Sequence, residues 1–276
     1  MANRVLMCES DISSQHYRAS DNMRFLYFVG TAGSGKSTLV QAYKEWLDAA
    51  DISSLIINLD PGSDATPYEP DIDIRDWISL GNVMEEYNLG PNGAQVVAAD
   101  LLTVNISKLT DALQGEDAKY VLIDTPGQLE LFAFRQSSID LVEALGKEKS
   151  MIVYTADPML CRTANGFISG EMLSMLVQFR LQIPIMNVLT KADILDDFER
   201  ERLVTWFEEP ETLYESLLDE DRNPQNIVGM ELFKTLENVG VFGQMRPVSA
   251  KEGEGMEEIY ATAQLAFFGG EDPEIE

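Results

Sequence analysis

A glycine-rich stretch between an apolar run and a helical pattern constrains this chain more than any other feature. The stretch is Gly30-Thr31-Ala32-Gly33-Ser34-Gly35-Lys36-Ser37, and it follows the apolar run Phe25–Val29. It fits the pattern G-x-x-x-x-G-K-[ST], whose backbone N–H groups surround phosphate oxygens at the start of a helix. The residues predicted to bind the phosphates of a nucleoside triphosphate are Gly30, Gly33, Ser34, Gly35, Lys36, Ser37 and Thr38.

The rest of the chain alternates short apolar runs with helical patterns. Runs that are apolar on both faces are typical of parallel strands buried between two layers of helices. Helical patterns cover Ser37–Ala50, the stripe Ile168–Phe179 and Gly255–Phe268. The pattern predicts an α/β protein with the three-layer P-loop NTPase fold, a mostly parallel central sheet and helical insertions. The six predicted strands are Phe25–Val29, Ser54–Leu59, Tyr120–Ile123, Met151–Thr155, Ile185–Leu189 and Arg246–Val248.

Three stretches that do not fit this minimal pattern suggest the domain organisation. Residues 1–22 are polar and aperiodic, and are predicted to form an N-terminal extension, while residues 271–276 form an acidic tail. Residues 23–270 are then predicted to be a single domain with an insertion at 61–119 and a helical insertion at 196–243. The apolar stripe Ile168–Phe179 is interpreted either as core or as a dimer surface.

Composition narrows the partners and the compartment. The chain has 47 acidic and 20 basic residues, a net charge of −27. Such a surface repels phosphate backbones and anionic lipid, so neither nucleic acid nor a membrane is an expected partner. The charge is interpreted either as a solvated surface or as a handle for a basic protein partner. Without a membrane-length apolar run or a secretory signal, and with only Cys8 and Cys161, the protein is expected to be cytoplasmic.

A second motif, Asp124-Thr125-Pro126-Gly127-Gln128, directly follows the third predicted strand. A carboxylate at this place can hold the shell of a Mg²⁺ ion, so Asp124 and the Ser37 hydroxyl are predicted metal residues. The N–H of Gly127 is predicted to reach the γ-phosphate, and Gln128 to orient the attacking water.

Two further motifs after strands indicate which base is bound. Thr190-Lys191-Ala192-Asp193 follows the fifth predicted strand, and Ser249-Ala250-Lys251 follows the last. A carboxylate can accept from both N1–H and N2–H₂ of guanine, a pairing that adenine does not offer. A lysine stem can lie along the base plane, and a backbone N–H can reach guanine O6. The predicted guanine-binding residues are Thr190, Lys191, Asp193, Ser249 and Ala250.

The complete set of motifs is similar to that of the GPN-loop GTPases, over roughly residues 23–268. Its specific feature is Gly90-Pro91-Asn92, which by itself would be interpreted as a β-turn. The segments around it also match the family: Asn58-Leu59-Asp60-Pro61, Pro67-Tyr68-Glu69-Pro70-Asp71-Ile72-Asp73-Ile74-Arg75-Asp76, Leu89-Gly90-Pro91-Asn92-Gly93 and Leu129-Glu130. Thr190 stands where many G proteins have asparagine, but members of this family commonly carry serine or threonine there.

The resemblance implies a dimeric GTPase that binds GTP or GDP together with Mg²⁺. In the family, the Gly-Pro-Asn loop of one protomer reaches the active site of the other, so Asn92 would act in trans. The resemblance places Asp60 in the metal and water shell, and Gln128 and Glu130 near the attacking water. It also implies a homodimeric switch with a protein client, for example in the assembly of RNA polymerase.

The sequence leaves two alternative functions and the role of Arg75 undecided. The chain could bind GTP without hydrolysing it and act as a scaffold for a partner. It could also be an ATP-driven protein on a similar sheet, although Asp193 argues against this. Arg75 could act as an arginine finger or form an ion pair with Asp73 or Asp76.

Overall fold

The computed structural model describes residues 22–63, 65–219, 224–242 and 245–269. Residues 1–21 of the predicted extension and the predicted tail 271–276 lie outside the described residues, so both stay predictions. The described chain folds around one seven-stranded sheet of order β3-β2-β4-β1-β5-β6-β7, in which all neighbours are parallel. The strands are β1 (Arg24–Gly30), β2 (Ser54–Asn58), β3 (Ile72–Asp73), β4 (Tyr120–Asp124), β5 (Ser150–Ala156), β6 (Ile185–Leu189) and β7 (Met245–Pro247).

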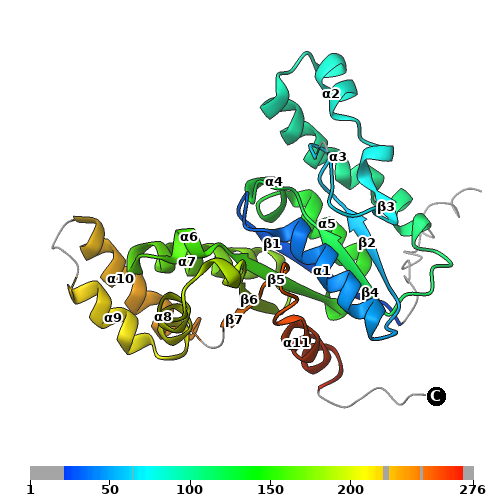
Figure 1. Cartoon of the computed structure of the whole chain (residues 1–276). Coiled ribbons are helices and arrows are strands. Elements are labelled where there is room, and N and C mark those ends of the chain that lie inside the picture. The colour runs from blue at the N-terminus through cyan, green and yellow to red at the C-terminus, as the bar shows by residue number, and fades with distance from the viewer. Residues whose placement is uncertain (1–21, 64, 220–223, 243–244, 270–276) are drawn as a thin grey trace, which may run out of the picture.

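Helices connect the strands and cover both faces of the sheet (Figure 1). The predicted three-layer α/β fold is therefore confirmed. No helix in the described ranges is long and apolar enough to cross a membrane. The helices are α1 (Lys36–Ala49), α2 (Leu80–Tyr87), α3 (Pro91–Ala112), α4 (Glu130–Ala133), α5 (Gln136–Leu145), α6 (Pro158–Cys161), α7 (Ala164–Leu181), α8 (Asp197–Glu208), α9 (Pro210–Asp219), α10 (Pro224–Asn238) and α11 (Met256–Phe268), with short 3-10 turns at Ile74–Asp76, Lys147–Lys149 and Ala192–Ile194.

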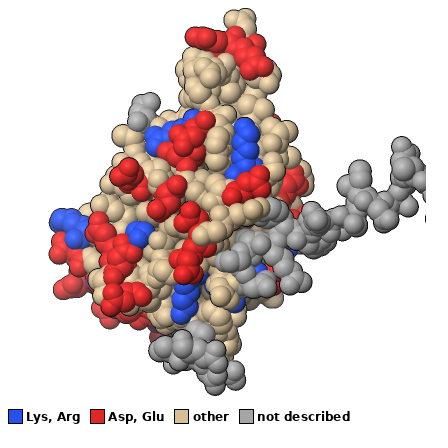
Figure 2. All heavy atoms as spheres, turned by 90° about the vertical axis from the view of Figure 1, so that its right-hand side faces the viewer, with Lys and Arg blue, Asp and Glu red and all other residues tan. Residues whose placement is uncertain are grey.

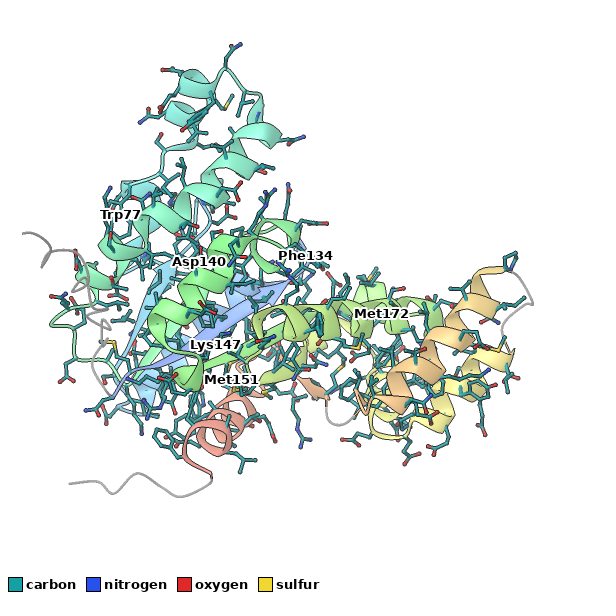
Figure 3. The ribbon with its side chains drawn as sticks, turned by 180° about the vertical axis from the view of Figure 1, so that it is seen from behind. Trp77, Phe134, Asp140, Lys147, Met151 and Met172 are labelled. Atoms are coloured by element: carbon teal, nitrogen blue, oxygen red, sulfur yellow. The ribbon has the colours of Figure 1, made fainter. Side chains whose placement is uncertain are left out.

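Side chains along the central strand β1 alternate between the two faces of the sheet and pack into two separate hydrophobic cores. Phe25, Tyr27 and Val29 join the core that includes residues of α3, α5 and α7, a face seen in Figure 3 with α5 and α7 over the strands. Leu26 and Phe28 join the other core, with α1 and α11. All five side chains are fully buried. Because β1 is anchored on both faces, the loop at its carboxyl end has a fixed base.

The structure adds one strand to the six that the pattern predicts. β3 pairs with β2 through Ile57–Ile72 and Asn58–Asp73. Two residues are too few to show a strand period, which explains why the sequence pattern misses it. The last predicted strand is shifted by one residue, to Met245–Pro247.

Segment 61–119 contains β3, α2 and α3, and the last two stand out from the body at the top of Figure 1. Gly90 is the N-cap of α3 and Pro91 is its first residue. Proline suits this position because the N–H it lacks would have no partner within the helix. The Gly-Pro-Asn tripeptide therefore begins a helix and is not a β-turn. The helix lies on α5, where Thr103 Oγ1 is 3.4 Å from Asp140 Oδ2.

The predicted apolar stripe on α7 is only partly core. Ile168 is buried, whereas Phe179 is 75% exposed. The buried face of this helix instead runs through Phe167, Glu171 and Ser174. Two of these three residues are polar, so the hydrophobic pattern alone points to a neighbouring face. The helical segment that follows, 196–243, contains α8, α9 and α10.

Candidate functional site

The glycine-rich stretch forms the connection between β1 and α1. Gly33 and Gly35 have φ angles of +77° and +90°, in the left-handed region that favours glycine. Gly30 is required for a different reason, because a Cβ there would lie 2.1 Å from Thr155 Oγ1 of β5. Ser34 Oγ lies 2.6 Å from the same Thr155 hydroxyl. The neighbouring strand therefore holds the loop in its curled form.

The ammonium of Lys36 lies inside this loop and is almost fully buried. It donates to the carbonyl oxygens of Gly30 at 3.0 Å and Thr31 at 2.9 Å, and lies 3.4 Å from that of Gly127. Burial lowers the pKa of Lys36, and the charge of Asp124 acts in the opposite direction. The arrangement gives a cation that can exchange carbonyl partners for phosphate oxygens.

The two carboxylate oxygens of Asp124, at the end of β4, have different surroundings. Oδ2 accepts from the Tyr68 hydroxyl at 2.6 Å, whereas the buried Oδ1 has no hydrogen-bond partner among the described residues. Burial raises the pKa of Asp124, and the nearby side chains of Ser37, Tyr68 and Lys36 lower it. Burial and the Asp124 charge also raise the pKa of Tyr68, so its hydroxyl stays protonated and donates.

This donor set fits a Mg²⁺ ion. An unpartnered buried carboxylate oxygen near the Ser37 hydroxyl offers two oxygen ligands or water partners at the edge of the phosphate loop. In the described ranges, no group of three or more His, Cys, Asp or Glu residues could hold a metal by itself. Mg²⁺ keeps several waters and binds substrate phosphates, so it needs no such cage.

Asp60 follows β2 and is hydrogen-bonded to two backbone N–H groups. Its Oδ1 accepts from Gly62 at 2.9 Å, and its Oδ2 accepts from Gly127 at 3.1 Å. The structure thus brings Asp60 to the loop after β4. The same N–H of Gly127 is the group predicted to reach the γ-phosphate, so Asp60 and a phosphate would compete for it.

Gln128 is exposed and reaches the helix that begins with Gly-Pro-Asn. Its Nε2 donates to Oε1 of Gln95 at 3.2 Å. Gln95 lies one turn beyond Asn92 on α3 and is also close to Gly62, where a Cβ would lie 2.9 Å from the Gln95 Nε2. Helix α3 therefore contacts the predicted catalytic loop of its own chain.

The predicted base-binding residues meet in a cavity of about 150 Å³ next to the phosphate loop. Ser249 Oγ donates to Asp193 Oδ1 at 2.8 Å, which holds the carboxylate in one orientation. The cavity is lined by Gly35, Thr38, Leu39, Thr190, Lys191, Asp193, Ile194, Val248, Ala250 and Lys251. Among the predicted base residues, Ser249 lies behind Asp193 and does not line the cavity.

Thr190 and Lys191, which line the cavity of the predicted base-binding residues, also contact the phosphate loop. The Thr190 hydroxyl donates to the Ser34 carbonyl at 2.7 Å and lies 3.0 Å from that of Ala156. Lys191 Nζ contacts the Gly33 carbonyl at 2.5 Å and Asp157 Oδ2 at 3.0 Å.

Three residues of interest lie apart from this cluster. Asn92 is exposed on the first turn of α3, and Glu130 is exposed at the start of α4. Arg75 forms an ion pair with Asp73 and donates to the Ser63 carbonyl at 2.9 Å. Of the two interpretations of Arg75, the structure therefore favours the ion pair.

Sequence reasoning missed four residues that contact the site. Thr155 and Asp157 lie at the carboxyl end of β5, beside the loop, and their position after a buried strand could have identified them. Tyr68 and Gln95 come from segment 61–119. Tyr68 lies in the stretch 67–76 that matches the family, but the sequence does not connect either side chain to the phosphate loop.

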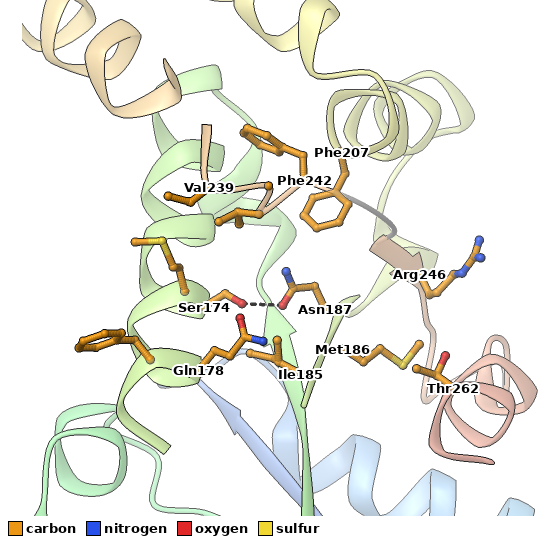
Figure 4. A pocket seen from close by; sticks show the side chains of 14 residues that line it. Ser174, Gln178, Ile185, Met186, Asn187, Phe207, Val239, Phe242, Arg246 and Thr262 are labelled. Carbon is orange, nitrogen blue, oxygen red and sulfur yellow. Dashed lines mark hydrogen bonds between the residues drawn. The ribbon is translucent and has the colours of Figure 1, made fainter. Parts of the chain in front are cut away.

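A larger cavity, of about 660 Å³, lies elsewhere, between α7, β6 and β7 (Figure 4). None of the predicted site residues lines it. At its wall, Ser174 Oγ lies 2.6 Å from Asn187 Oδ1, and Asn187 Nδ2 donates to Glu171 Oε2 at 3.1 Å. Burial raises the pKa of Glu171 to about 8.

The parallel sheet, the phosphate loop after β1 and the carboxylate after β4 together define a P-loop nucleotide-binding protein. Residues 28–267 match a family model described as "Conserved hypothetical ATP binding protein". That description names ATP, whereas the sequence motifs that contain Asp193 and Ser249 predict guanine.

Named relatives and a solved structure identify the family more closely. The chain is 34% identical over 238 residues to a GPN-loop GTPase from Pyrococcus abyssi, covering 86% of this chain and 94% of that protein. It is 30% identical to GPN-loop GTPase 1 of Dictyostelium discoideum. This alignment covers 86% of this chain but only 60% of the length of the relative. A crystal structure described as a GTPase in apo form from Pyrococcus abyssi superposes with a TM-score of 0.79 at 31% identity, over 91% of this chain and 99% of that one. The chain belongs to the GPN-loop GTPase family.

Proposed function

We propose that this protein binds GTP with Mg²⁺ and hydrolyses it to GDP and phosphate. The observation that carries the proposal is the position of Lys36 and Asp124 on one side of the phosphate loop, with Asp193 in the base cavity on the other. Membership of the GPN-loop GTPase family supports it. These three side chains provide for phosphate, metal and base respectively.

Each step of the reaction is assigned to a group of this chain. Lys36 and the backbone N–H groups of the loop would bind the β- and γ-phosphates and stabilise the charge that develops on them. Ser37 and Asp124 would hold Mg²⁺, which neutralises phosphate charge when bound, and Asp60 would belong to the same shell. Gln128 would hold the attacking water in line with the γ-phosphate, and Glu130 would assist it.

The same proposal extends to a homodimer in which Asn92 completes the active site of the partner. Asn92 is exposed near the end of a helical pair that stands out from the body (Figure 1). Its amide can donate to a phosphate and accept from water, and the preceding proline restricts its backbone. Nucleotide hydrolysis would then be coupled to opening and closing of the dimer.

A protein client in the cytoplasm, rather than nucleic acid or a membrane, completes the proposal. Figure 2 shows one face of the molecule on which Asp and Glu are widespread and Lys and Arg occur in a few small groups. A net charge of −27 disfavours binding to phosphate backbones and anionic lipid. A basic surface on a protein client, such as a subunit of a complex under assembly, would be attracted to it.

The test is phosphate release from GTP and from ATP with Mg²⁺, measured over a range of protein concentrations. We expect hydrolysis of GTP alone, with a specific activity that rises with protein concentration. Asn92→Ala should lower that activity, whereas Asn82→Ala, which removes another exposed asparagine from the same helical pair, should not. Binding of GTP without turnover at any concentration would instead identify a GTP-gated scaffold.

A further inference from the structure

Tyr68 contacts the predicted metal site from the loop before β3, a stretch that matches the family but in which no role is assigned to Tyr68. Its hydroxyl lies 2.6 Å from Asp124 Oδ2, although the two residues are 56 positions apart in the chain. The ring is partly buried against the core that contains α1 and α11. The contact is therefore a partly buried hydrogen bond to a carboxylate, which belongs to the stronger class of hydrogen bonds.

The loop that carries Tyr68 is fixed on both sides of this residue. Before it, Thr66 Oγ1 donates to the Tyr68 carbonyl at 2.7 Å. After it, Asp71 accepts from the Ile56 N–H at 2.7 Å and returns its own N–H to the Ile56 carbonyl at 2.9 Å. Prolines at 67 and 70 restrict the backbone between these anchors. Tyr68 is thus held on the edge of β2, independently of the phosphate loop.

The hydrogen bond decides which oxygen of Asp124 remains available. Because Oδ2 accepts from Tyr68, the carboxylate cannot turn without losing this hydrogen bond. Oδ1 is left buried and without a hydrogen-bond partner among the described residues, beside the Ser37 side chain. A carboxylate fixed at one oxygen presents the other in a single direction, as ligands of metal sites do when a neighbour orients them.

We propose that Tyr68 is a positioning residue, which holds the Asp124 carboxylate so that its free oxygen faces the Mg²⁺ that accompanies the nucleotide. The inference rests on the proposed function and adds a residue to it. Segment 61–119 then serves the metal site of its own chain through Tyr68, in addition to the action in trans proposed for Asn92. Tyr68 touches neither substrate nor metal, and acts only through Asp124.

The test compares the affinity of the purified protein for a fluorescent GDP analogue with Mg²⁺ and with EDTA. In the wild-type protein, Mg²⁺ should tighten binding. Tyr68→Phe removes only the hydroxyl, and should reduce this gain from Mg²⁺ about tenfold, the size typical for the loss of a residue that orients a metal ligand. The affinity measured in EDTA should not change, because the phosphate and base contacts do not involve Tyr68.

Tyr43→Phe is the matched control. It removes another buried tyrosine hydroxyl, one without a hydrogen-bond partner among the described residues, and should leave the gain from Mg²⁺ unchanged. In an Asp124→Ala background, Tyr68→Phe should have no further effect, and thermal unfolding should show that each variant is folded.

An unchanged gain from Mg²⁺ in folded Tyr68→Phe, while the wild-type protein responds to Mg²⁺, would overturn the inference and leave the proposed function intact. An equal loss of affinity in EDTA would also overturn it, by showing a role in general structure. A wild-type protein that binds no guanine nucleotide would instead overturn the proposed function itself.

Discussion

The N–H of Gly127 donates to Asp60 Oδ2 at 3.1 Å, and this contact joins the loops that follow β2 and β4. Gly127 is also bound through its carbonyl, 3.4 Å from Lys36 Nζ. The backbone N–H and carbonyl of Gly127 are thus both held by side chains that are predicted to serve the nucleotide. Binding of a γ-phosphate would exchange these partners, which links the position of the loop to the nucleotide.

If Asp60 holds the Gly127 backbone, Asp60→Ala should increase hydrogen exchange in the loop after β4. Peptides that cover residues 124–129 should exchange faster in protein without added nucleotide, because the Gly127 N–H loses its acceptor. Mass spectrometry of deuterated protein measures the effect. Asp76→Ala, which removes an exposed carboxylate from segment 61–119, should leave exchange unchanged. Equal exchange in wild type and Asp60→Ala would show that Asp60 does not hold the loop.

Gln95 should affect turnover through Gln128. Its Oε1 accepts from Gln128 Nε2, which leaves the Gln128 carbonyl oxygen free to accept from the attacking water. Gln95→Leu removes the acceptor and should lower kcat about tenfold with little change in KM, since one hydrogen bond to the catalytic amide is lost. Gln95→Glu keeps an acceptor and should retain most activity.

Single-turnover hydrolysis of GTP by these two variants measures the effect of Gln95. Gln128→Ala should by itself lower the rate of GTP hydrolysis about 100-fold, the effect typical of a misplaced reacting group. Adding Gln95→Leu to it should have no further effect. Additive losses in the double variant would indicate that Gln95 acts elsewhere.

Base selectivity should depend on Asp193 and, to a smaller degree, on Ser249. Asp193→Ala removes two hydrogen bonds from guanine to a carboxylate, and should weaken GTP binding roughly 100-fold or more. Ser249→Ala frees the carboxylate from its 2.8 Å partner and removes the acceptor of the Glu252 N–H, and it should weaken GTP binding about tenfold or less. Competition between GTP and ATP for a fluorescent nucleotide tests both. Retained preference for GTP in Asp193→Ala would assign selectivity to other groups.

Thr190 is expected to be a stability residue as well as a neighbour of the base. Thr190→Val keeps the shape but leaves the Ser34 and Ala156 carbonyls without its hydroxyl. Because the group is buried, the free energy of unfolding should fall by about 1–3 kcal/mol. Thr190→Ser retains the hydroxyl and should lose less. Urea unfolding measures the difference, and similar values for the two variants would contradict this role of the hydroxyl.

Glu171 should make the protein less stable as the pH rises. Burial raises the pKa of Glu171 in the folded protein to about 8, from 4.5. Between these values the folded state keeps a proton that the unfolded chain releases, so this group lowers stability by up to about 1.4 kcal/mol per pH unit.

Glu171→Gln removes that contribution and should flatten the dependence of the free energy of unfolding on pH between 5 and 8. Glu201→Gln, at an exposed position, should keep the wild-type slope. Urea unfolding at several pH values measures both variants. Parallel curves for wild type and Glu171→Gln would show that Glu171 ionises normally.

Much of the site was predictable because its residues lie in short contiguous sequence motifs. Parallel strands end at one edge of the sheet, so the residues that follow buried strands, including Lys36, Asp124 and Asp193, had to meet once the strands were recognised. Strong apolar runs revealed six strands, whereas the two-residue β3 carries no period of its own. The role of each residue in the site stays a prediction until it is tested.

What the sequence by itself determined is the class of fold, the phosphate loop and the kind of base, because local patterns specify backbone form and strand ends. Only the tertiary structure decided that Tyr68 meets Asp124, 56 positions away, and that Gln95 meets Gln128, 33 positions away. Such contacts depend on how segment 61–119 lies on the sheet. That placement results from the burial of many side chains together, and no short pattern encodes it.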